Sequence, residues 1–533
     1  MRWTRQRVAG VGMADAIPVI VPDPWDLAWH ELNDQGNADR FVAHAGGLLL
    51  HVRGWGWIAY RDGCWSREDG ERLAALKAME VARHMREEVR ALNEALENRK
   101  LPKGMTEEML QGRIEALAKH ANQSGNANRT KAMLEQASKL DVLNRSIEDF
   151  DSDPLALNVA NGTLRFRQDR GGEWGVSFRL HDPADLITRK ASVEWIEDEK
   201  ARVPNAEWLK HLKTALPNED VRWFFQKLMG YCATGLTLEQ IFVLLQGKGG
   251  DGKSTAMNVL RIVLGGYAVS GNVKSFIDTR DSDAGGPTPE LIRFVGDTRL
   301  ISLQEPKRGK ALAEDRVKQF TGGSPVTYRA LYGAEEEFEP QGKVVMECNS
   351  RPRISGDDDG IWRRIVIVLW PHQFKGSAIV KGMDRRILAA EGGGSGVLAW
   401  IVEGVLAYLR DGLEQPEDVQ DAIEEYRRSA NPFSEWMAAC VVADPLALTL
   451  AADLYRSYKD WCQEQEIDER AVMSHSAFGR ALGDRQIIVK GKDRRGKVLR
   501  RGARLRDDAG AGEAGADGAD DGGDIWPGDS MAP

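Results

Sequence analysis

The stretch Ile241-Phe-Val-Leu-Leu-Gln-Gly247-Lys-Gly-Gly-Asp-Gly252-Lys253-Ser254-Thr255 sets the architecture that we expect for the chain around it. Residues 241–245 are apolar, too few for a helix, and rich enough in branched side chains to predict a buried strand. The next residues fit the spacing G-x-x-x-x-G-K-[ST], and residues 256–264 have the pattern of a helix. A strand, a glycine-rich loop and a helix in this order predict an α/β domain built on a phosphate-binding loop.

Each residue type in this loop has a physical reason. The glycines let the backbone fold back so that its N–H groups point at phosphate oxygens. The Lys253 ammonium reaches the β- and γ-phosphates, and the Ser254 hydroxyl is a ligand for Mg²⁺. The positive N-terminal end of the following helix adds to the attraction. We therefore expect ATP with Mg²⁺ to bind at Gly247, Gly249, Gly250, Asp251, Gly252, Lys253, Ser254 and Thr255.

Hydrolysis of ATP also needs a carboxylate that orients water and a positive charge for the transition state. Glu305 ends the apolar strand predicted at residues 299–305, which makes it the candidate for orienting water. Asn349 ends the strand predicted at residues 343–349 and can hydrogen-bond the γ-phosphate or the water. Arg363 and Arg364 are candidates for an arginine finger that reaches the ATP of a neighbouring subunit, although salt bridges to the nearby aspartates are the alternative.

The composition is that of a soluble globular protein, with 42% hydrophobic and 29% charged residues. The 533 residues suffice for about three domains. No apolar run approaches the length of a membrane span, and the N-terminus lacks the apolar core of a secretory signal. The five cysteines are scattered without a C-x-x-C pair, which favours free thiols in a reducing cytosol. We expect a cytoplasmic protein with no membrane partner.

The formal net charge of −9 at first disfavours a nucleic-acid partner, but the acids are unevenly placed. Residues 507–533 contain eight acidic residues and no Lys or Arg, so the rest of the chain carries −9 + 8 = −1. A nearly neutral folded part can carry basic patches. The Gly-, Ala- and Asp-rich composition of residues 507–533 predicts a disordered acidic tail.

Hydrophobic patterning divides the remaining chain. Residues 1–35 predict a flexible arm, and residues 36–205 a mainly helical domain with β-hairpins. Its signals include a hairpin turn at Arg61-Asp62-Gly63 and helical spacing over residues 71–98. Asp149, Asp151 and Asp153 precede a proline and predict an exposed turn rather than a metal site.

The ATPase domain is expected over residues 206–415 and a small C-terminal domain over residues 416–506. In the latter, helical patterns precede a basic hairpin of two short strands, which suggests a winged helix that binds DNA. The basic side chains that we expect to contact DNA there are Lys490, Lys492, Arg494 and Arg495.

Several of these segments together resemble the motif series of superfamily 3 helicases. They are the phosphate-binding loop, Glu305, Lys318-Gln-Phe-Thr-Gly-Gly323, Tyr328-Arg329-Ala-Leu-Tyr, Asn349 and Trp362-Arg363-Arg364. The chain is most similar to the phage and plasmid primase–helicase family, which is related to the poxvirus replicative helicase–primase. Upstream, Trp57, Asp62-Gly, Trp65, Asn161-Gly-Thr-Leu and Gly230-Tyr-Cys-Ala-Thr-Gly235 resemble the helical domain of that family. The resemblance covers approximately residues 41–408.

This resemblance implies an AAA+-like P-loop ATPase core, a hexameric ring and ATP-driven unwinding of single-stranded and forked DNA during phage or mobile-element replication in a bacterial host. Lys253 and Ser254 would bind ATP and Mg²⁺, Glu305 would serve as Walker B, Asn349 as sensor 1, and Arg364 or Arg363 as the finger. A hairpin over residues 326–340 would face DNA, with Lys318, Arg329 and Lys343 as its available charges.

The chain departs from the family pattern at two positions. Gln304 stands where an acid often precedes the Walker B glutamate, so binding of Mg²⁺ would rest on Ser254 and Glu305. Ser324 stands where an aspartate usually follows the Thr-Gly-Gly stretch. In addition, about 40 residues precede the first matching segment, and no separate paired-carboxylate site or zinc motif is visible. We therefore expect a helicase without its own primer-synthesising site, served by a separate primase or polymerase.

Two other functions remain open from the sequence. The basic hairpin fits a DNA-binding replication initiator in which ATP controls only assembly. A primase–helicase that also synthesises primers is the second. A nucleotide kinase fits less well, because no acceptor lid is evident after the phosphate-binding loop.

Overall fold

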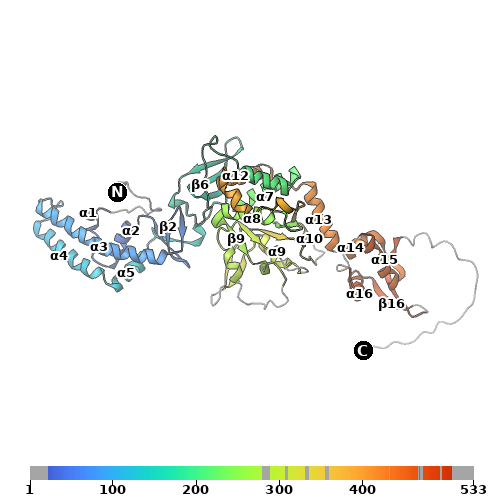
Figure 1. The fold of residues 1–533 in the computed structure, drawn as a ribbon. Helices are drawn as coiled ribbons and strands as arrows, with labels where there is room; N and C mark the ends of the chain where they lie inside the picture. The colour runs from blue at the N-terminus through green and yellow to red at the C-terminus, as the bar shows by residue number, and fades with distance from the viewer. Residues whose placement is uncertain are drawn as a thin grey trace, which may run out of the picture. The chain divides into compact units, whose positions relative to one another are not determined.

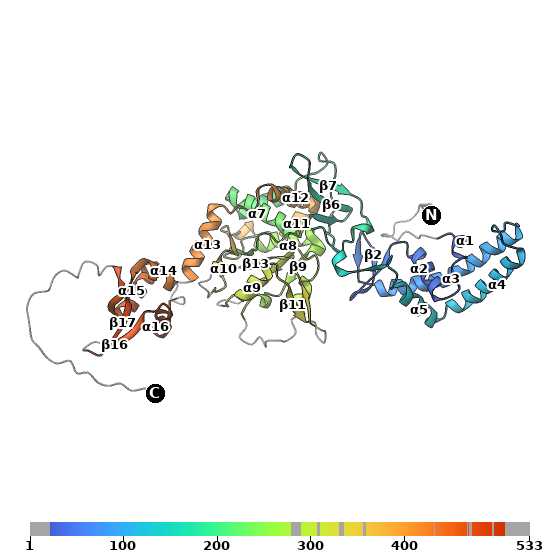
Figure 2. The ribbon, with the colours of Figure 1, turned by 180° about the vertical axis from the view of Figure 1, so that it is seen from behind.

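The computed structural model describes residues 22–278, 289–305, 310–329, 335–354, 359–430, 432–465, 467, 472–492 and 495–506. They form two compact units, one within residues 1–352 and 363–420 and the other within residues 353–362 and 421–533 (Figures 1 and 2). Most of the arm predicted at residues 1–35 and the whole tail predicted at residues 507–533 lie outside the described residues. The described residues combine many helices with a parallel sheet, so the fold is of the mixed α/β kind.

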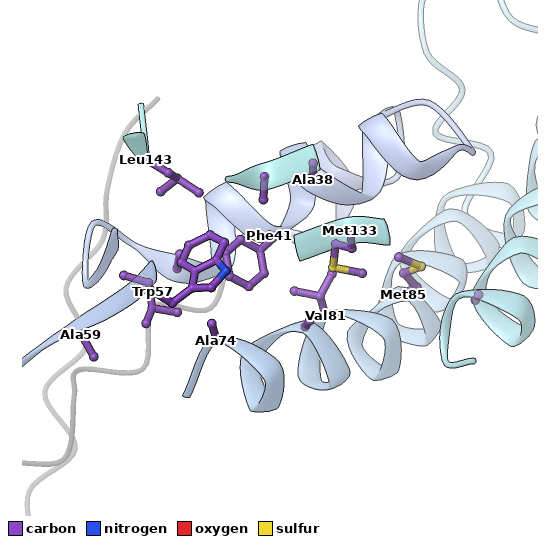
Figure 3. Close-up of a cluster of buried hydrophobic side chains, with 14 residues drawn as sticks. Ala38, Phe41, Trp57, Ala59, Ala74, Val81, Met85, Met133 and Leu143 are labelled. Carbon is purple, nitrogen blue, oxygen red and sulfur yellow. The ribbon is translucent and has the colours of Figure 1, made fainter. Parts of the chain in front are cut away.

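The first unit begins with a group of helices on a shared apolar core. The helices are α1 (Pro24–Leu27), α2 (Asp34–Ala45), α3 (Gly70–Glu97), α4 (Glu107–Ser124) and α5 (Ala127–Ala137). Helix α3 coincides with the helix that we predicted over residues 71–98. The side chain of Asn33 caps α2 and that of Thr106 caps α4, which satisfies backbone donors at both N-termini. Figure 3 shows the core, in which Phe41 of α2 and Met85 of α3 lie among the buried side chains.

Two small sheets accompany these helices. The first has the order β3-β2-β1-β4, with β1 (Leu49–Val52), β2 (Gly56–Arg61), β3 (Cys64–Ser66) and β4 (Asn144–Arg145). The hairpin of β2 and β3 turns at the predicted Asp62-Gly63. The second sheet is an antiparallel meander of β5 (Ala156–Val159), β6 (Gly162–Gln168) and β7 (Trp174–Arg179). Helices α6 (Ala206–Ala215) and α7 (Glu219–Ala233) follow and lead to the central sheet.

The centre of the first unit is a five-stranded parallel sheet with the order β14-β8-β13-β10-β9. Its strands are β8 (Phe242–Gly247), β9 (Ala268–Gly271), β10 (Leu300–Leu303), β13 (Lys343–Cys348) and β14 (Ile365–Trp370). The predicted strands at residues 241–245, 299–305 and 343–349 are confirmed within one or two residues. Because all strands run parallel, their carboxyl ends meet along one edge of the sheet.

Helices and one hairpin surround this sheet. They are α8 (Lys253–Leu264), α9 (Glu314–Thr321), α11 (Met383–Ala389), α12 (Gly393–Asp411) and the antiparallel pair β11 (Val326–Arg329) and β12 (Glu335–Phe338). Helices α7 and α12 pack side by side, as Figures 1 and 2 both show. A Cβ atom at Gly230 would lie 2.2 Å from the carbonyl carbon of Gly404, so these glycines permit the close approach of the two helices.

A buried ion pair ties the meander to the central sheet. Arg299 donates to both carboxylate oxygens of Asp297, to the carbonyl oxygen of Ala233 and to that of Ala156 on β5, each within 2.8 Å. Its guanidinium also lies 4.3 Å from the centre of the Tyr267 ring. A charge this deeply buried is tolerated because every contact is a hydrogen bond, an ion pair or a π face.

The second unit contains α10 (Asp359–Trp362), the end of α13 (Glu417–Ala430), and a small domain on its own apolar core. That domain comprises α14 (Pro432–Cys440), β15 (Val441–Leu450), α15 (Ala451–Glu464), α16 (His475–Asp484), β16 (Ile488–Lys492) and β17 (Val498–Leu505). The predicted helices and the basic hairpin are present, but our sequence reading missed β15. Proline is rare inside a strand, so Pro445 argued against one here. In the structure this proline lies where the register between β15 and β17 shifts.

Among the described residues, no single helix has the length and apolar character to cross a membrane. The pair α11 and α12, bent by 92°, meets the length and composition criteria only when the two are taken together.

Candidate active site

The loop between β8 and α8 has the backbone conformation that its glycines predict. Gly249, Gly250 and Gly252 have φ angles of 83°, 63° and 88°, in the left-handed region that favours glycine. At Gly247 the restriction is space, because a Cβ atom there would lie 2.0 Å from a carboxylate oxygen of Asp251. The loop therefore curls tightly before α8 begins at Lys253.

This loop borders a cavity of about 330 Å³ at the carboxyl edge of the parallel sheet. The cavity is lined by Gly249, Gly250, Asp251, Lys253, Ser254, Asn258, Arg261, Ser270, Ser302, Gln304, Glu305, Glu347, Cys348 and Asn349. The structure thus brings the predicted loop residues together with Glu305 and Asn349, although these come from separate strands. Gly247, Gly252 and Thr255 belong to the loop but do not line the cavity.

The loop already binds an anionic group of its own chain. The carboxylate of Asp251 accepts hydrogen bonds from the backbone N–H of Gly249 at 3.1 Å and of Lys253 at 3.3 Å. The Lys253 ammonium also contacts this carboxylate, and it lies 3.4 Å from the amide oxygen of Asn349. Backbone donors and an ammonium group around one carboxylate are the partners that a phosphate requires, so the donors of the loop fit ATP.

A carboxylate that sequence reasoning missed lies beside Ser254. The Ser254 hydroxyl donates to the Oε2 atom of Glu347, on β13, at 2.5 Å. Burial raises the pKa of the Glu347 carboxyl, and the Ser254 hydrogen bond opposes that shift. The sequence does contain a signal for Glu347, which is a charged residue between the buried Met346 and Cys348. Successive side chains of a strand point to opposite faces, so Glu347 lies on the other face from these two residues.

Glu305 and Asn349 also line the cavity and are hydrogen-bonded to each other. The backbone N–H of Asn349 donates to one carboxylate oxygen of Glu305 at 3.0 Å, and its side-chain amide donates to the other at 2.6 Å. The two predicted residues therefore form one bidentate unit at the ends of β10 and β13, facing the Lys253 side chain.

Three further residues, which the sequence did not indicate, contact the backbone of the loop. The His211 imidazole lies 3.1 Å from the carbonyl oxygen of Gly252, and burial lowers its pKa. The Phe374 ring stacks on the His211 ring, and its backbone N–H donates to Gly250 at 2.8 Å. Gln373 donates to the carbonyl oxygen of Gly249. No local motif marks these positions, because the contacts join segments 41 residues apart for His211 and 124 residues apart for Gln373.

The two candidate finger residues differ in exposure. Arg364 is 7% exposed, and its guanidinium donates to the Thr321 hydroxyl at 3.0 Å and to the Gln240 side chain at 3.3 Å. Arg363 is exposed. Arg364 thus serves contacts within its own chain, whereas Arg363 presents its charge to the surroundings.

The predicted DNA-facing hairpin is present, but the charge of its described part is acidic. Arg329 ends β11 opposite Glu335, and Glu336 and Glu337 follow on β12. Lys318 lies half-buried on α9. The turn at residues 330–334 lies outside the described residues, so the DNA contact of this hairpin stays a prediction.

The predicted DNA contact of Lys343 is wrong. Lys343 is 4% exposed, and its ammonium donates to the carbonyl oxygens of Thr234, Leu236 and Gln341. Burial lowers its pKa to about 7. The side chain stands at the first position of a buried strand and points into the protein, so it cannot reach a nucleic acid.

The basic hairpin of the second unit carries its exposed cations towards the turn. Lys492 and Arg495 are exposed, as is Lys497. By contrast, Arg500 is held by the carbonyl oxygens of Ile487 and Gly479. Arg494 and the side chain of Lys490 lie outside what the structure describes.

Comparison with known proteins gives a consistent set of relatives. Residues 38–217 match the family model described as "D5 N terminal like". The chain is 26% identical over 331 residues to "Putative helicase L207/L206" of Acanthamoeba polyphaga mimivirus, covering 59% of this chain and 34% of the relative. It is 23% identical over 360 residues to "Putative primase C962R" of African swine fever virus (strain Badajoz 1971 Vero-adapted), covering 62% of this chain and 35% of the relative.

A third relative is "Putative helicase 022R" of Frog virus 3, at 23% identity over 46% of this chain and 26% of the relative. The chain therefore spans between about a quarter and a third of the length of these curated relatives. Among solved structures, the apo NrS-1 C-terminal region aligns with a TM-score of 0.38 and 11% identity, covering 64% of this chain and 95% of that chain. This structural likeness is too weak to support an inference about function.

Proposed function

Since the chain belongs to the primase–helicase family, we propose that it is an ATP-dependent DNA helicase of the superfamily 3 type. The observation that carries this proposal is the convergence of Lys253, Ser254, Glu305, Glu347 and Asn349 on one cavity. These residues come from the loop and from the ends of two parallel strands, and together they supply phosphate donors, carboxylates and an amide.

The loop between β8 and α8 is the part of the site that binds the phosphates. A triphosphate takes the backbone donors and the Lys253 ammonium from the Asp251 carboxylate, which occupies them within the chain. The exchange releases Asp251 to solvent and places the Lys253 charge against the β- and γ-phosphates. His211, Gln373 and Phe374 keep the loop in shape during this exchange.

The residues around Ser254 fit Mg²⁺. The Ser254 hydroxyl and the Glu347 and Glu305 carboxylates offer hard oxygen ligands to the same cavity. Bound there, Mg²⁺ would neutralise charge that develops on the phosphate oxygens. Glu347 would supply the second acid that Gln304 cannot.

Glu305 is the residue that we assign to orienting the attacking water. Its carboxylate is fixed by two hydrogen bonds from Asn349, which restricts its rotation and leaves its remaining lone pairs for a water. The Asn349 amide oxygen also lies 3.4 Å from the Lys253 ammonium, so one residue joins the water-orienting side to the phosphate-binding side.

The transition state needs a further positive charge, which we assign to Arg363 of a neighbouring copy. Arg363 is preferred over Arg364 because the latter is buried in contacts with Thr321 and Gln240. A charge supplied in trans requires a homo-oligomer, for which we propose a hexameric ring around DNA. The exposed cations of the β16–β17 hairpin would hold the phosphate backbone electrostatically.

ATP hydrolysis by wild type and Lys253→Ala tests the catalytic part of this proposal. We expect Mg²⁺-dependent hydrolysis by the wild type, stimulated by DNA, and loss of that activity in Lys253→Ala. Lys139→Ala is a matched control, because Lys139 is exposed and does not line the cavity. Equal hydrolysis by wild type and Lys253→Ala would exclude the loop as the catalytic site.

A replication initiator is the second candidate, favoured by the basic β16–β17 hairpin. In an initiator, ATP binding controls assembly on DNA, and duplex separation does not follow turnover. Glu305→Gln separates the two functions, since it leaves the phosphate donors intact and removes the water-orienting carboxylate. An initiator retains its DNA assembly and output in this variant, whereas a helicase loses strand separation.

A further inference from the structure

Two histidines and a glutamate meet where α2 packs against α3, in a part of the chain that the proposed ATPase site does not use. They are His44 of α2, and Glu80 and His84 of α3. Each offers one nitrogen or carboxylate oxygen, and these atoms lie within 4.8 Å of one another. His44 is buried at 4% exposure, whereas Glu80 and His84 are partly exposed and open the cluster to solvent.

In the part of the chain that the structure describes, three imidazole nitrogens of this cluster have no hydrogen-bond partner. Within the described structure, neither ring nitrogen of His44 has a hydrogen-bond partner, and neither does the Nδ1 atom of His84. The two rings stack with their centres 5.0 Å apart and their planes at 25°. A buried polar group without a partner is costly, so such groups call for an explanation such as an ion.

The backbone beneath the cluster is held firmly. Glu80 and His84 are four residues apart on α3, which places both on the same helix face. Phe41, one turn before His44, packs with Val81 and Met85 of α3 in the core that Figure 3 shows. The two helices are therefore fixed by apolar packing, and the three polar side chains lie on an ordered scaffold.

From this arrangement we propose that His44, Glu80 and His84 form a binding site for a divalent transition metal of the Zn²⁺ class. Two imidazoles and a carboxylate are a ligand set that zinc accepts, with water as the fourth ligand. Ligand atoms around a tetrahedral ion stand roughly 3.3 Å apart when each bond is about 2.0–2.1 Å long. Side-chain rotation of Glu80 and His84, which are partly exposed, closes the remaining gap without movement of the helices.

The Lys77 ammonium pairs with Glu80 and must leave it before that carboxylate can bind a metal. The Lys77 ammonium lies 2.7 Å from the Oε2 atom of Glu80, while the other carboxylate oxygen lies 3.9 Å from His84 Nδ1. The Lys77 side chain is partly exposed, so it can turn to solvent when the metal binds Glu80. The metal would clamp α2 to α3, and its binding is independent of the proposed ATP hydrolysis.

The test uses the whole 533-residue chain, stripped of metal with a chelator and titrated with Co²⁺, which reports tetrahedral imidazole ligation by visible absorption. We expect one intense Co²⁺ spectrum per chain, its displacement by Zn²⁺, and a rise of Tm with Zn²⁺. His84→Ala and Glu80→Gln should weaken Co²⁺ binding by more than the roughly 10–100-fold that loss of an outer-shell partner costs.

His475→Ala is the matched control, because His475 is exposed and lies in the second unit. It should bind Co²⁺ as the wild type does. Far-UV circular dichroism without metal establishes that each variant is folded, and Glu80→Gln, which keeps the side-chain shape, serves if His84→Ala is not. Absence of a tetrahedral spectrum in the wild type would overturn the proposal, as would equal Co²⁺ binding and equal Tm response in wild type and Glu80→Gln.

Discussion

The Ser254 hydroxyl donates to the Glu347 carboxylate across 2.5 Å, which joins the start of α8 to the end of β13. The contact brings an acid to the residue that the loop motif assigns to Mg²⁺. Gln304, on the adjacent β10 end, cannot act as an anionic ligand, although it lines the same cavity. The acid that contacts Ser254 therefore comes from β13.

Glu347→Gln should therefore raise the Mg²⁺ concentration needed for half-maximal ATP hydrolysis and lower the maximal rate. The reason is the loss of one anionic oxygen ligand while the hydrogen bond to Ser254 is preserved. Steady-state hydrolysis measured across a Mg²⁺ series checks this.

A second-site change provides the control for that prediction. Adding Gln304→Glu to Glu347→Gln restores an acid at the neighbouring strand end, and we expect the Mg²⁺ dependence to return towards that of the wild type. An unchanged Mg²⁺ dependence in Glu347→Gln would show that this glutamate serves only the packing around Ser254.

Arg363→Ala and Arg364→Ala should fail for different reasons. Arg363→Ala is expected to keep its stability and ATP affinity and to lose about 10³-fold or more in hydrolysis. Arg364→Ala should lower the free energy of unfolding by about 1–3 kcal/mol, because the Thr321 and Gln240 contacts are lost. Denaturant unfolding and nucleotide binding separate the two effects.

Mixing of inactive variants locates the finger. An oligomer of Arg363→Ala and Lys253→Ala subunits contains interfaces with an intact loop facing an intact Arg363, so hydrolysis should reappear on mixing. If the mixture stayed as inactive as its components, Arg363 would not act between subunits.

The paired change Lys492→Gln and Arg495→Gln should weaken DNA binding and reduce its dependence on salt. Each phosphate contact contributes about 0.9 to the slope of log K against log salt on duplex DNA, so loss of two contacts lowers the slope by about 1.8. The exposed pair Arg90→Gln and Lys139→Gln, on the N-terminal helical part, is the control and should leave the slope unchanged. Fluorescence anisotropy over a salt series provides both values.

Asp151 should make stability depend on pH. Burial, together with the nearby Asp297, raises the pKa of the Asp151 carboxyl from 3.8 to about 6. The folded state therefore binds the proton more tightly than the unfolded state does, and the stabilisation present below pH 3.8 is lost as the pH rises through 6. Two pKa units correspond to about 3 kcal/mol.

Asp151→Asn removes this titration while keeping an acceptor for the Thr188 backbone N–H, which donates to Asp151 at 2.8 Å. The difference in unfolding free energy between wild type and variant should fall by up to about 3 kcal/mol from pH 4 to pH 7. Parallel pH profiles for the two proteins would refute the assignment.

Local pattern was sufficient where one face or one run of residues determined the structure. The strand predicted at residues 343–349 is observed at Lys343–Cys348, because its run of apolar residues, Val344 to Met346, is buried. The phosphate-binding loop followed from glycine spacing, since positive φ angles are what glycine permits.

Local pattern failed where a distant partner determined the environment. Asp151 seemed part of an exposed turn, but its carboxylate accepts from Thr188, which lies 37 residues away. Lys343 was predicted to contact DNA, but its ammonium donates to three carbonyl oxygens. Those of Thr234 and Leu236 precede β8, and that of Gln341 precedes β13. Glu347 was overlooked because only the packing of β13 beside β8 brings it to Ser254.

Strand separation on a forked duplex, with wild type and Lys253→Ala compared at equal protein concentration, tests the central claim most directly. We predict that the wild type separates the strands only with hydrolysable ATP and Mg²⁺, and that Lys253→Ala does not separate them while still binding the fork. Separation by Lys253→Ala, or none by a wild type that hydrolyses ATP on the same DNA, would contradict the assignment of a helicase.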